Sequence, residues 1–276
     1  MLVLYASLRF PIYSIKLEDA YQVGASHLLP SPSAIIGSFL QSLARTKPGI
    51  FYGRNMNEAT SDALSFANEY IITATCKALE PVIPASIILN RWKILEEKGK
   101  KMGPISYEGL KDYAKVRDAR IREYITSMGL KIFLLFHDVI LERITNDELK
   151  IALFNINRLG DTESLSSVIE EPKLIKAQPY TKHRELVSTL TPARFITNLP
   201  FDVVYSDMYS LPNYGKYVIS RKYKDEGKLQ RYILPLKPQK FDKFYAYVPS
   251  VFEAEPIQGI NIIKVDDDKI LVASSA

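Results

Sequence analysis

Apolar and polar positions follow a definite order through the first 70 residues. In residues 2–10 every even position is apolar, and this two-residue period predicts a strand. Ser31 and Pro32 are typical of the start of a helix, and apolar residues then recur at helical spacing from 35 to 43. Residues 57–69 predict a second helical stretch. The chain therefore opens with a strand followed by helical structure.

The alternation continues to residue 169. Residues 70–77 and 130–141 are rich in residues that favour strands, residues 146–148 can cap a helix that ends near 154, and residues 164–169 alternate again. The resulting order is strand, helix, strand, strand, helix, strand. This order predicts an α+β fold of the ferredoxin-like (RRM-like) βαββαβ type, in which two helices cover one sheet face. We expect the other face to be free for RNA or a partner protein.

A long insertion, residues 86–126, separates the second and third predicted strands and exceeds an ordinary connection. Its middle carries Lys98, Lys100 and Lys101, which fit either a protruding arm that binds phosphates or a solvated charged loop. Arg91 and Trp92 favour the arm, because an aromatic ring beside cations can stack on a base. A single tryptophan is nevertheless more often a core residue. The basic residues of 115–122 can continue the same surface on a helix, or can pair with neighbouring acids.

The hydrophobic pattern and the composition of the chain change after residue 170. Short strands rich in Tyr and Phe and spaced by prolines replace the helical pattern in residues 171–276. Residues 225–227 and 266–268 are candidate hairpin turns. The basic stretch 221–231 can bind a polyanion or can protect an edge strand by charge. We therefore predict two regions, a ferredoxin-like domain over 1–170 and a mostly β region over 171–276.

The charge is unevenly distributed. The 276 residues carry a formal net charge of +5, but residues 86–125 hold ten Lys or Arg against six Asp or Glu, and residues 173–240 hold thirteen against five. A polyanion that contacts both windows meets far more positive potential than the total implies. Composition thus favours a nucleic-acid partner over a neutral one.

The cysteine content and the hydropathy of the chain bear on its cellular location. Cys76 is the only cysteine, which excludes an intramolecular disulfide and a CxxC metal knuckle. The apolar run near the start lacks a basic leading region, and the run at 132–136 is far shorter than the ~20 residues of a membrane helix. We expect a cytoplasmic protein with no membrane association.

Candidate chemistry is sparse. No metalloprotease, phosphate-loop, dinucleotide or nucleophile-elbow motif is present, and we expect no cofactor and no metal. Tyr180, Lys182 and His183 together can support metal-free RNA cleavage, with His183 as general acid or base and Lys182 stabilising charge. The alternative, a basic loop that only contacts phosphate or solvent, is the simpler interpretation. His27 is a weaker candidate, and His137 is best explained as structural.

The segment 157–165 predicts a tight polar turn. Gly160 stands between charged residues, which favours a backbone turn that presents Arg158, Asp161 and Glu163. The two acids repel phosphate, so pairing with basic residues or contact with a partner protein suits them better. Arg158 is the residue of this turn that we expect to touch RNA or a neighbouring subunit.

Several segments together resemble the CRISPR-associated Cas-five family of the RAMP superfamily. They are Leu8-Arg9-Phe10-Pro11, Tyr21-Gln22-Val23, Leu28-Leu29-Pro30-Ser31-Pro32-Ser33-Ala34-Ile35-Ile36-Gly37 and Arg158-Leu159-Gly160-Asp161-Thr162-Glu163-Ser164. The resemblance covers residues 1–170 and is strongest to the archaeal subtype I-A branch.

The resemblance implies an RNA-binding subunit of a Cascade surveillance complex in antiviral defence, acting by binding and not as an enzyme. Such a subunit holds and caps the 5′ handle of the crRNA and contacts the large backbone subunit. Its insertion is a thumb beside the guide and the target DNA strand, which makes Arg91, Lys98, Lys100 and Lys101 thumb candidates. Ser31 and Ser33 become candidate handle contacts or helix caps. The full set of RNA-binding candidates is Gln22, Ser31, Ser33, Arg91, Trp92, Lys98, Lys100, Lys101, Arg158 and Lys182.

Three other functions remain open at this point. One is a metal-free endoribonuclease that cleaves the CRISPR repeat through Tyr180, Lys182 and His183. Another is a backbone subunit of a type III effector complex. The last is a protein-only scaffold whose basic windows are merely solvated.

Overall fold

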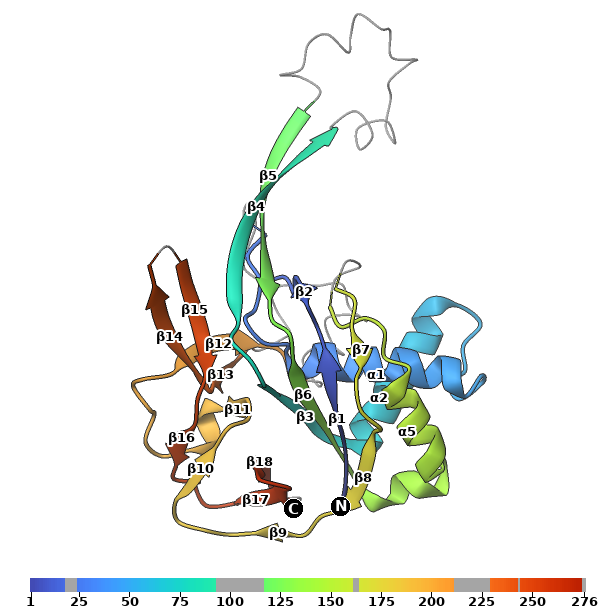
Figure 1. Ribbon diagram of the computed structural model, residues 1–276. Helices are drawn as coiled ribbons and strands as arrows, with labels where there is room; N and C mark the ends of the chain where they lie inside the picture. Colours follow the sequence, from blue (N-terminus) through green and yellow to red (C-terminus); the bar gives the residue numbers. More distant parts are fainter. Residues whose placement is uncertain (18–23, 93–116, 161–163, 211–228, 243, 275–276) are drawn as a thin grey trace, which may run out of the picture.

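The central feature is an antiparallel sheet that runs through the body of the protein (Figure 1). The computed structural model describes residues 1–17, 24–92, 117–160, 164–210, 229–242 and 244–274. The sheet has the order β3-β6-β1, and both β7 and β8 pair with the outer side of β1. Its strands are β1 (Leu2–Arg9), β3 (Ile71–Ala78), β6 (Leu130–Phe136), β7 (Ser167–Val168) and β8 (Lys173–Lys176).

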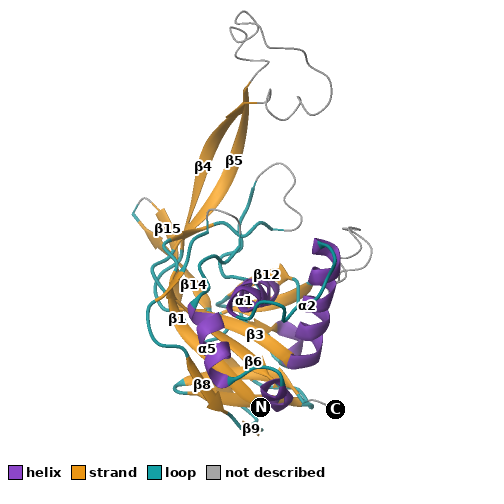
Figure 2. Ribbon diagram, turned by 90° about the vertical axis from the view of Figure 1, so that its right-hand side faces the viewer, coloured by secondary structure: helices purple, strands orange, loops and turns teal. Residues whose placement is uncertain are grey.

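Three α-helices occur in the described residues, and they pack on one face of this sheet (Figure 2). They are α1 (Pro32–Thr46), α2 (Met56–Tyr70) and α5 (Asn146–Phe154). Polar side chains fix each start. Ser31 caps α1, Asn55 caps α2, and Thr145 with Glu148 forms a capping box on α5. These caps satisfy backbone N–H groups that the first turn of a helix leaves without partners.

The even positions of β1 build the main core. Leu4 and Leu8 are fully buried and belong to one apolar cluster with Ile36, Phe39 and Leu149 of the helices. The predicted strand and helices are therefore confirmed in these places. The odd positions of β1 face the opposite side of the sheet, as the two-residue period of a strand requires.

The opposite face of the sheet is covered, which corrects our expectation of a free face. Val3 and Phe133 are fully buried there against Ile263 and Val265. The covering element is the hairpin of β17 (Ile260–Val265) and β18 (Asp268–Ala273), turned by Asp266 with φ of 53°. The predicted turn at 266–268 is confirmed. Because both faces are buried, the sheet itself offers RNA no platform.

Two predicted strands are shorter than expected. The strand predicted over 130–141 ends at Phe136, and Asp138–Glu142 form a 3-10 helix, η2. The strand predicted over 164–169 is reduced to Ser167–Val168, because Ser166 donates from its backbone to Asn157 and Ser164 accepts from Leu159. These bonds belong to the turn of 157–165 and compete with strand pairing.

The rest of the described chain forms short antiparallel pairs. Its strands are β9 (Pro179–Tyr180), β10 (Glu185–Val187), β11 (Thr191–Pro192), β12 (Val204–Met208), β13 (Gln230–Leu234), β14 (Leu236–Phe241), β15 (Phe244–Pro249) and β16 (Phe252–Ala254), with a 3-10 helix η3 (Ala193–Phe195). The β character predicted for this region is confirmed. Leu234 and Leu236 belong to the same apolar cluster as the helices. The boundary at residue 170 stays a prediction, and β8, which lies just beyond it, pairs with β1.

A two-stranded ribbon projects far from the body (Figure 1). It consists of β4 (Ile83–Trp92) and β5 (Arg117–Thr126), and β2 (Ile12–Tyr13) pairs with the base of β5. The ribbon occupies the place of the insertion predicted over 86–126. The helix considered for 115–122 is wrong where the structure describes it, because residues 117–126 pair in register with 83–92. Residues 93–116 lie outside the described part.

Candidate nucleic-acid interface

Ser14 joins two distant segments of the chain at the base of the ribbon. Its backbone N–H donates to Oγ of Ser164 at 3.0 Å, and that hydroxyl donates back to the Ser14 carbonyl at 3.1 Å. Nε of Arg122, on β5, donates to Oγ of Ser14 at 3.3 Å. The turn that ends at Ser164 and the ribbon therefore meet at one buried serine.

The loop that leads into α1 reaches the same place. Backbone N–H of His27 donates to the Ile15 carbonyl at 2.8 Å, and backbone N–H of Ile15 donates to Oγ of Ser26 at 2.9 Å. Earlier in the same loop, Gly24 forms two backbone hydrogen bonds with the ribbon. Its N–H donates to the Ile121 carbonyl at 2.9 Å, and its carbonyl accepts from the Glu123 N–H at 2.8 Å. Gln22 itself lies outside the described residues.

The turn of 157–165 is as tight as its sequence predicts. Gly160 has φ of +108°, and a Cβ built on it would lie 2.6 Å from Cγ1 of Ile15. The turn is thus pressed against the Tyr13–Ile15 segment, and only glycine fits there without strain. Arg158 is half-buried and forms an isolated bridge with Leu165. No described carboxylate pairs with Arg158, while Asp161 and Glu163 lie outside the described residues.

Ser31 and Ser33 lie at the start of α1, where Ser31 caps the helix. Both are buried, their hydroxyls lie 2.9 Å apart, and Oγ of Ser31 accepts from the Ala34 backbone N–H at 3.2 Å. This is the capping role that the sequence left open. Contact of either serine with RNA stays a prediction.

The ribbon carries one described cation and aromatic pair. The Arg122 guanidinium lies 5.3 Å from the centre of the Tyr124 ring. Arg91 and Trp92 occupy the far end of β4, opposite Asp118 and Arg117, but their side chains are outside the description. The thumb candidates Lys98, Lys100 and Lys101 fall outside it entirely.

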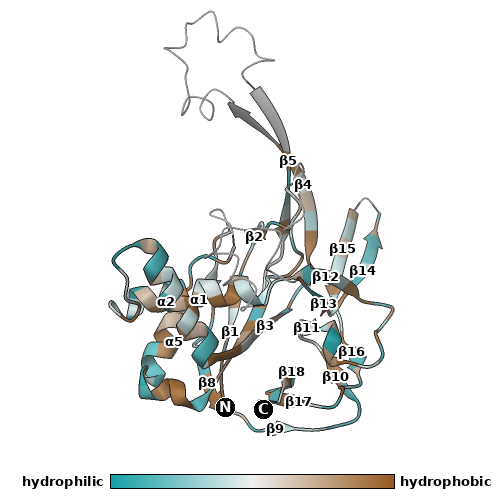
Figure 3. Cartoon of the chain, turned by 180° about the vertical axis from the view of Figure 1, so that it is seen from behind, coloured by the Kyte–Doolittle hydropathy of each residue, from teal (hydrophilic) through white to brown (hydrophobic). Residues whose placement is uncertain are grey.

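Apolar side chains are also exposed on the ribbon. Ile87, Ile88 and Ile121 are 46%, 66% and 44% exposed, and Ile88 and Ile121 are direct cross-strand partners. Figure 3 shows this apolar stretch on β4 above the point where the ribbon leaves the body. Exposed aliphatic pairs on a projecting element are typical of contact surfaces for other macromolecules.

The cluster proposed for RNA cleavage is organised around a carboxylate that the sequence analysis missed. Tyr180 donates to Oε2 of Glu185 at 3.3 Å, Lys182 to the same oxygen at 3.0 Å, and Lys269 to Oε1 at 3.0 Å. The bonds from Lys269 and Lys182 lower the pKa of Glu185 to about 2. His183 is exposed beside them. An ionised carboxylate between Tyr180 and Lys182 repels a scissile phosphate, which argues for a structural cluster.

Sequence reasoning also missed an aromatic pair at the tip of the β14–β15 hairpin. Phe241 and Phe244 stack with ring centres 5.1 Å apart, and they are 37% and 49% exposed. Two phenylalanines that flank a charged two-residue turn were the signal that could have revealed it.

The described residues contain no helix long and apolar enough to cross a bilayer. They also contain no group of three or more His, Cys, Asp or Glu side chains arranged to hold a metal ion.

Comparisons with known proteins identify relatives of this chain. No family model matches it. A protein of Methanocaldococcus jannaschii, "CRISPR-associated protein Cas5", is 29% identical over 257 residues, which cover 91% of both chains. A protein of the same name from Thermoproteus tenax is 30% identical over 163 residues, 59% of this chain and 62% of that protein.

One solved structure agrees at the level of the fold. The "Crystal structure of a CRISPR protein from Archaeoglobus fulgidus" aligns over the whole of both chains with a TM-score of 0.58 and 14% identity. A chain of a "CRISPR RNA-guided surveillance complex" aligns over 90% of this chain and 91% of its own length, but its TM-score of 0.44 is too low to carry an argument. The resemblance to the Cas-five family predicted from the sequence is thus confirmed: the chain is similar over 59% and 91% of its length to two archaeal proteins that bear the name CRISPR-associated protein Cas5.

Proposed function

We propose that this chain is the RNA-binding subunit of a subtype I-A Cascade complex that holds and caps the 5′ handle of the crRNA. The proposal rests on the hydrogen bonds that bring distant segments together at Ser14. Three segments far apart in the sequence are bonded to the short stretch Ser14–Ile15, through Ser26 and His27, Arg122, and Ser164. Ser164 is the last residue of one of the segments on which the family resemblance rests. Such a junction can position several loops around one RNA end.

The chemistry around the junction suits single-stranded RNA. Arg122 beside the Tyr124 ring supplies a cation and a stacking surface, and Arg158 lies on the adjacent turn. Single-stranded ends are bound by stacking on aromatic rings, while cations hold the phosphates. Lys182 is a weaker candidate, because its ammonium group is already bonded to Glu185.

The ribbon fits the role of a thumb. It projects from the body, ends at Arg91 and Trp92 on β4, and exposes the Ile88–Ile121 pair along its length. We infer that its apolar part contacts the large backbone subunit and that its basic end lies beside the guide and the target DNA strand. A cytoplasmic location in antiviral defence follows from this assembly.

Binding, not catalysis, is the activity that we propose. The Tyr180, Lys182 and His183 cluster keeps Tyr180 and Lys182 engaged with Glu185, so neither is free to act on RNA in this arrangement. Incubation of the protein with labelled repeat RNA in EDTA tests this directly. Cleavage that His183→Ala abolishes would establish the endoribonuclease instead.

The main test is co-purification combined with a binding measurement. We expect the chain to co-purify with the backbone subunit and a guide RNA on co-expression. With the purified chain, Arg158→Ala should weaken binding of an RNA that bears the crRNA 5′ end by about tenfold, since a charge-assisted bond contributes about 1.5–3 kcal/mol. Fluorescence anisotropy measures this change.

Arg231→Ala provides the matched control. Arg231 is exposed and pairs with Asp207 at 3.2 Å on β12, so its removal should leave RNA affinity unchanged. Recovery of the chain without RNA or partner under native expression, together with equal RNA affinity of both variants and the wild type, would contradict the proposal.

We further assign the N-terminal unit to the ferredoxin-like class. The order β3-β6-β1-β8, antiparallel throughout, and the position of all three described helices on one face support this assignment. In chain order the four strands are β1, β3, β6 and β8, which matches a βαββαβ unit with the ribbon inserted between its second and third strands.

A further inference from the structure

A cavity of about 570 Å³ lies where the helical unit meets the C-terminal strands, away from the Ser14 junction. Its walls come from the start of α1, the end of α2, the start of β3, η3, β13 and the end of β18. Cavities of this size at the meeting of two structural units are typical of small-molecule sites. None of the interactions described above for the RNA interface uses it.

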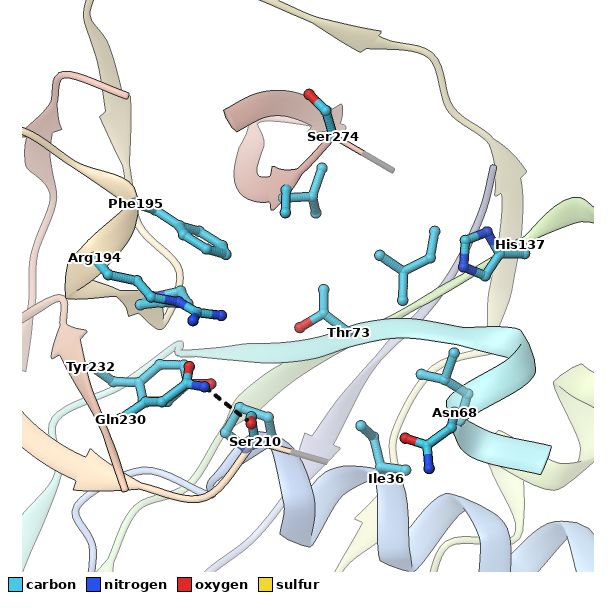
Figure 4. Close-up of a pocket in the computed structure, with 16 residues that line it drawn as sticks. Ile36, Asn68, Thr73, His137, Arg194, Phe195, Ser210, Gln230, Tyr232 and Ser274 are labelled. Atoms are coloured by element: carbon cyan, nitrogen blue, oxygen red, sulfur yellow. Dashed lines mark hydrogen bonds between the residues drawn. The ribbon is translucent and has the colours of Figure 1, made fainter. Parts of the chain in front are cut away.

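One wall of the cavity combines a cation with aromatic rings. In Figure 4, Arg194 and Phe195 extend into the cavity from one side, and Tyr232 lies just beneath them. The Arg194 guanidinium lies 5.5 Å from the centre of the Phe195 ring, and no described carboxylate pairs with it. Arg194 is exposed, so an anionic ligand can reach it.

Tyr232 adds a polar group to the same wall. Its side chain is only 4% exposed and lines the cavity. Burial raises its pKa to about 12, although the nearby Arg194 charge lowers it. A hydroxyl in the wall of a cavity can form a hydrogen bond with a ligand bound there.

The remaining walls are apolar or carry uncharged polar groups. Ile36, Ile71 and Val272 are apolar, and Asn68 and His137 stand on the side opposite Arg194 (Figure 4). Among the described lining residues none is acidic. The site thus suits a ligand with a flat ring, hydrogen-bonding edges and a negative group.

We propose that this cavity binds one nucleotide unit, with its phosphate on Arg194, its base against Phe195 and a polar edge of the base or sugar on the Tyr232 hydroxyl. The same chemistry is supplied by a free nucleoside 5′-monophosphate or by one residue of an RNA strand. The proposal does not depend on the handle-binding function, because it rests on different residues.

Titration calorimetry with the four nucleoside 5′-monophosphates, with inorganic phosphate as a separate ligand, tests the site. We expect one nucleotide per chain, bound at least tenfold more tightly than phosphate alone. Arg194→Ala and Phe195→Ala should each weaken binding about tenfold or more, because each removes a main contact, and Tyr232→Phe should weaken it several-fold.

Two exposed residues outside the cavity serve as matched controls. Arg231→Ala changes a neighbour of Tyr232 that pairs with Asp207, and Phe201→Ala removes a fully exposed ring. Both should bind nucleotide like the wild type. Thermal unfolding of every variant checks that the loss of binding is not a loss of folding.

Competition with a single-stranded RNA distinguishes the two sources. Displacement of the nucleotide by RNA, with equal weakening of RNA by Arg194→Ala, identifies an RNA residue as the ligand. Nucleotide binding that saturating RNA leaves intact identifies a free nucleotide. The proposal is overturned if phosphate binds as well as the nucleotides, or if neither nucleotide nor RNA binding depends on Arg194 and Phe195 in folded variants. RNA binding that depends on Arg158, together with nucleotide binding that does not depend on Arg194 and Phe195, would retain the handle-binding function and reject the cavity.

Discussion

Gly160 shows how one residue holds the turn of 157–165 in place. It combines a backbone angle that L side chains rarely adopt with a contact that leaves no room for a Cβ beside Ile15. The turn that carries Arg158 is therefore positioned by the absence of a side chain. Its glycine was recognisable in the sequence, whereas the contact with Ile15, 145 positions earlier, was not.

Substitution of Gly160 and of Gly259 separates the strain of a positive φ from the clash of an added Cβ. Gly160→Ala should destabilise the fold by about 2–4 kcal/mol, because it adds a clash to the strain of a positive φ. Gly259→Ala is the control, since Gly259 has φ of +85° but open space around its Cα, and it should cost only about 1 kcal/mol. Urea unfolding of both variants measures the difference, and equal losses would exclude the clash as a cause.

At the scale of elements, a buried ionic cluster anchors the β17–β18 hairpin to the sheet. Asp268 is 2% exposed and bonds to Lys77 of β3, to Lys131 of β6 at 3.0 Å and to Ser188 at 3.1 Å. Burial alone would raise the pKa of Asp268, but the bonds from Lys77 and Lys131 outweigh it and lower the pKa. Lys131 also lies 4.9 Å from the centre of the Tyr5 ring.

This cluster should make stability depend on pH. The pKa of Asp268 is below its unfolded value of about 3.9, so its stabilisation is complete above that value and is lost as the pH falls through the folded pKa. Asp268→Asn should cost about 3 kcal/mol at pH 7, since the half-buried ammonium groups of Lys77 and Lys131 lose this carboxylate and Lys131 keeps only Asp266. In urea unfolding between pH 5 and 3, the variant should lose less further stability than the wild type. Glu253→Gln, at the surface, should behave like the wild type, and an equal pH slope for Asp268→Asn would contradict the assignment.

Elements close in the sequence were predictable, and contacts between distant elements were not. Ser31 and the apolar spacing of 35–43 gave α1, and alternation gave β1, because caps and periodicity are local. The cover that β17–β18 provides for Val3 and Phe133 depends on packing across most of the chain, which no local pattern encodes. The same limit applied to the site. The tight turn beside Arg158 and the position of the insertion were readable in the sequence, and the role of Arg158 stays a prediction. Ser14, Glu185 and Arg194 gain their meaning only from partners far away in the sequence.

At the scale of the whole molecule, charge should control RNA affinity. The net charge is only +5, but residues 86–125 and 173–240 concentrate positive charge. If the protein contacts about four phosphates of a single-stranded RNA, raising the salt concentration from 50 to 200 mM should weaken RNA binding about fiftyfold. Anisotropy titrations over a salt series measure the slope. An affinity that does not change with salt would rule out phosphate contacts as the source of binding.

The buried second face of the sheet has a consequence for biosynthesis. Residues of β1 leave the ribosome long before residues 260–273, which form the hairpin that covers Val3 and Tyr5. The central sheet therefore stays half uncovered until this hairpin has been synthesised, and a nascent or truncated chain presents an apolar, aggregation-prone surface. A chain cut short near residue 255 should need a chaperone to remain in solution.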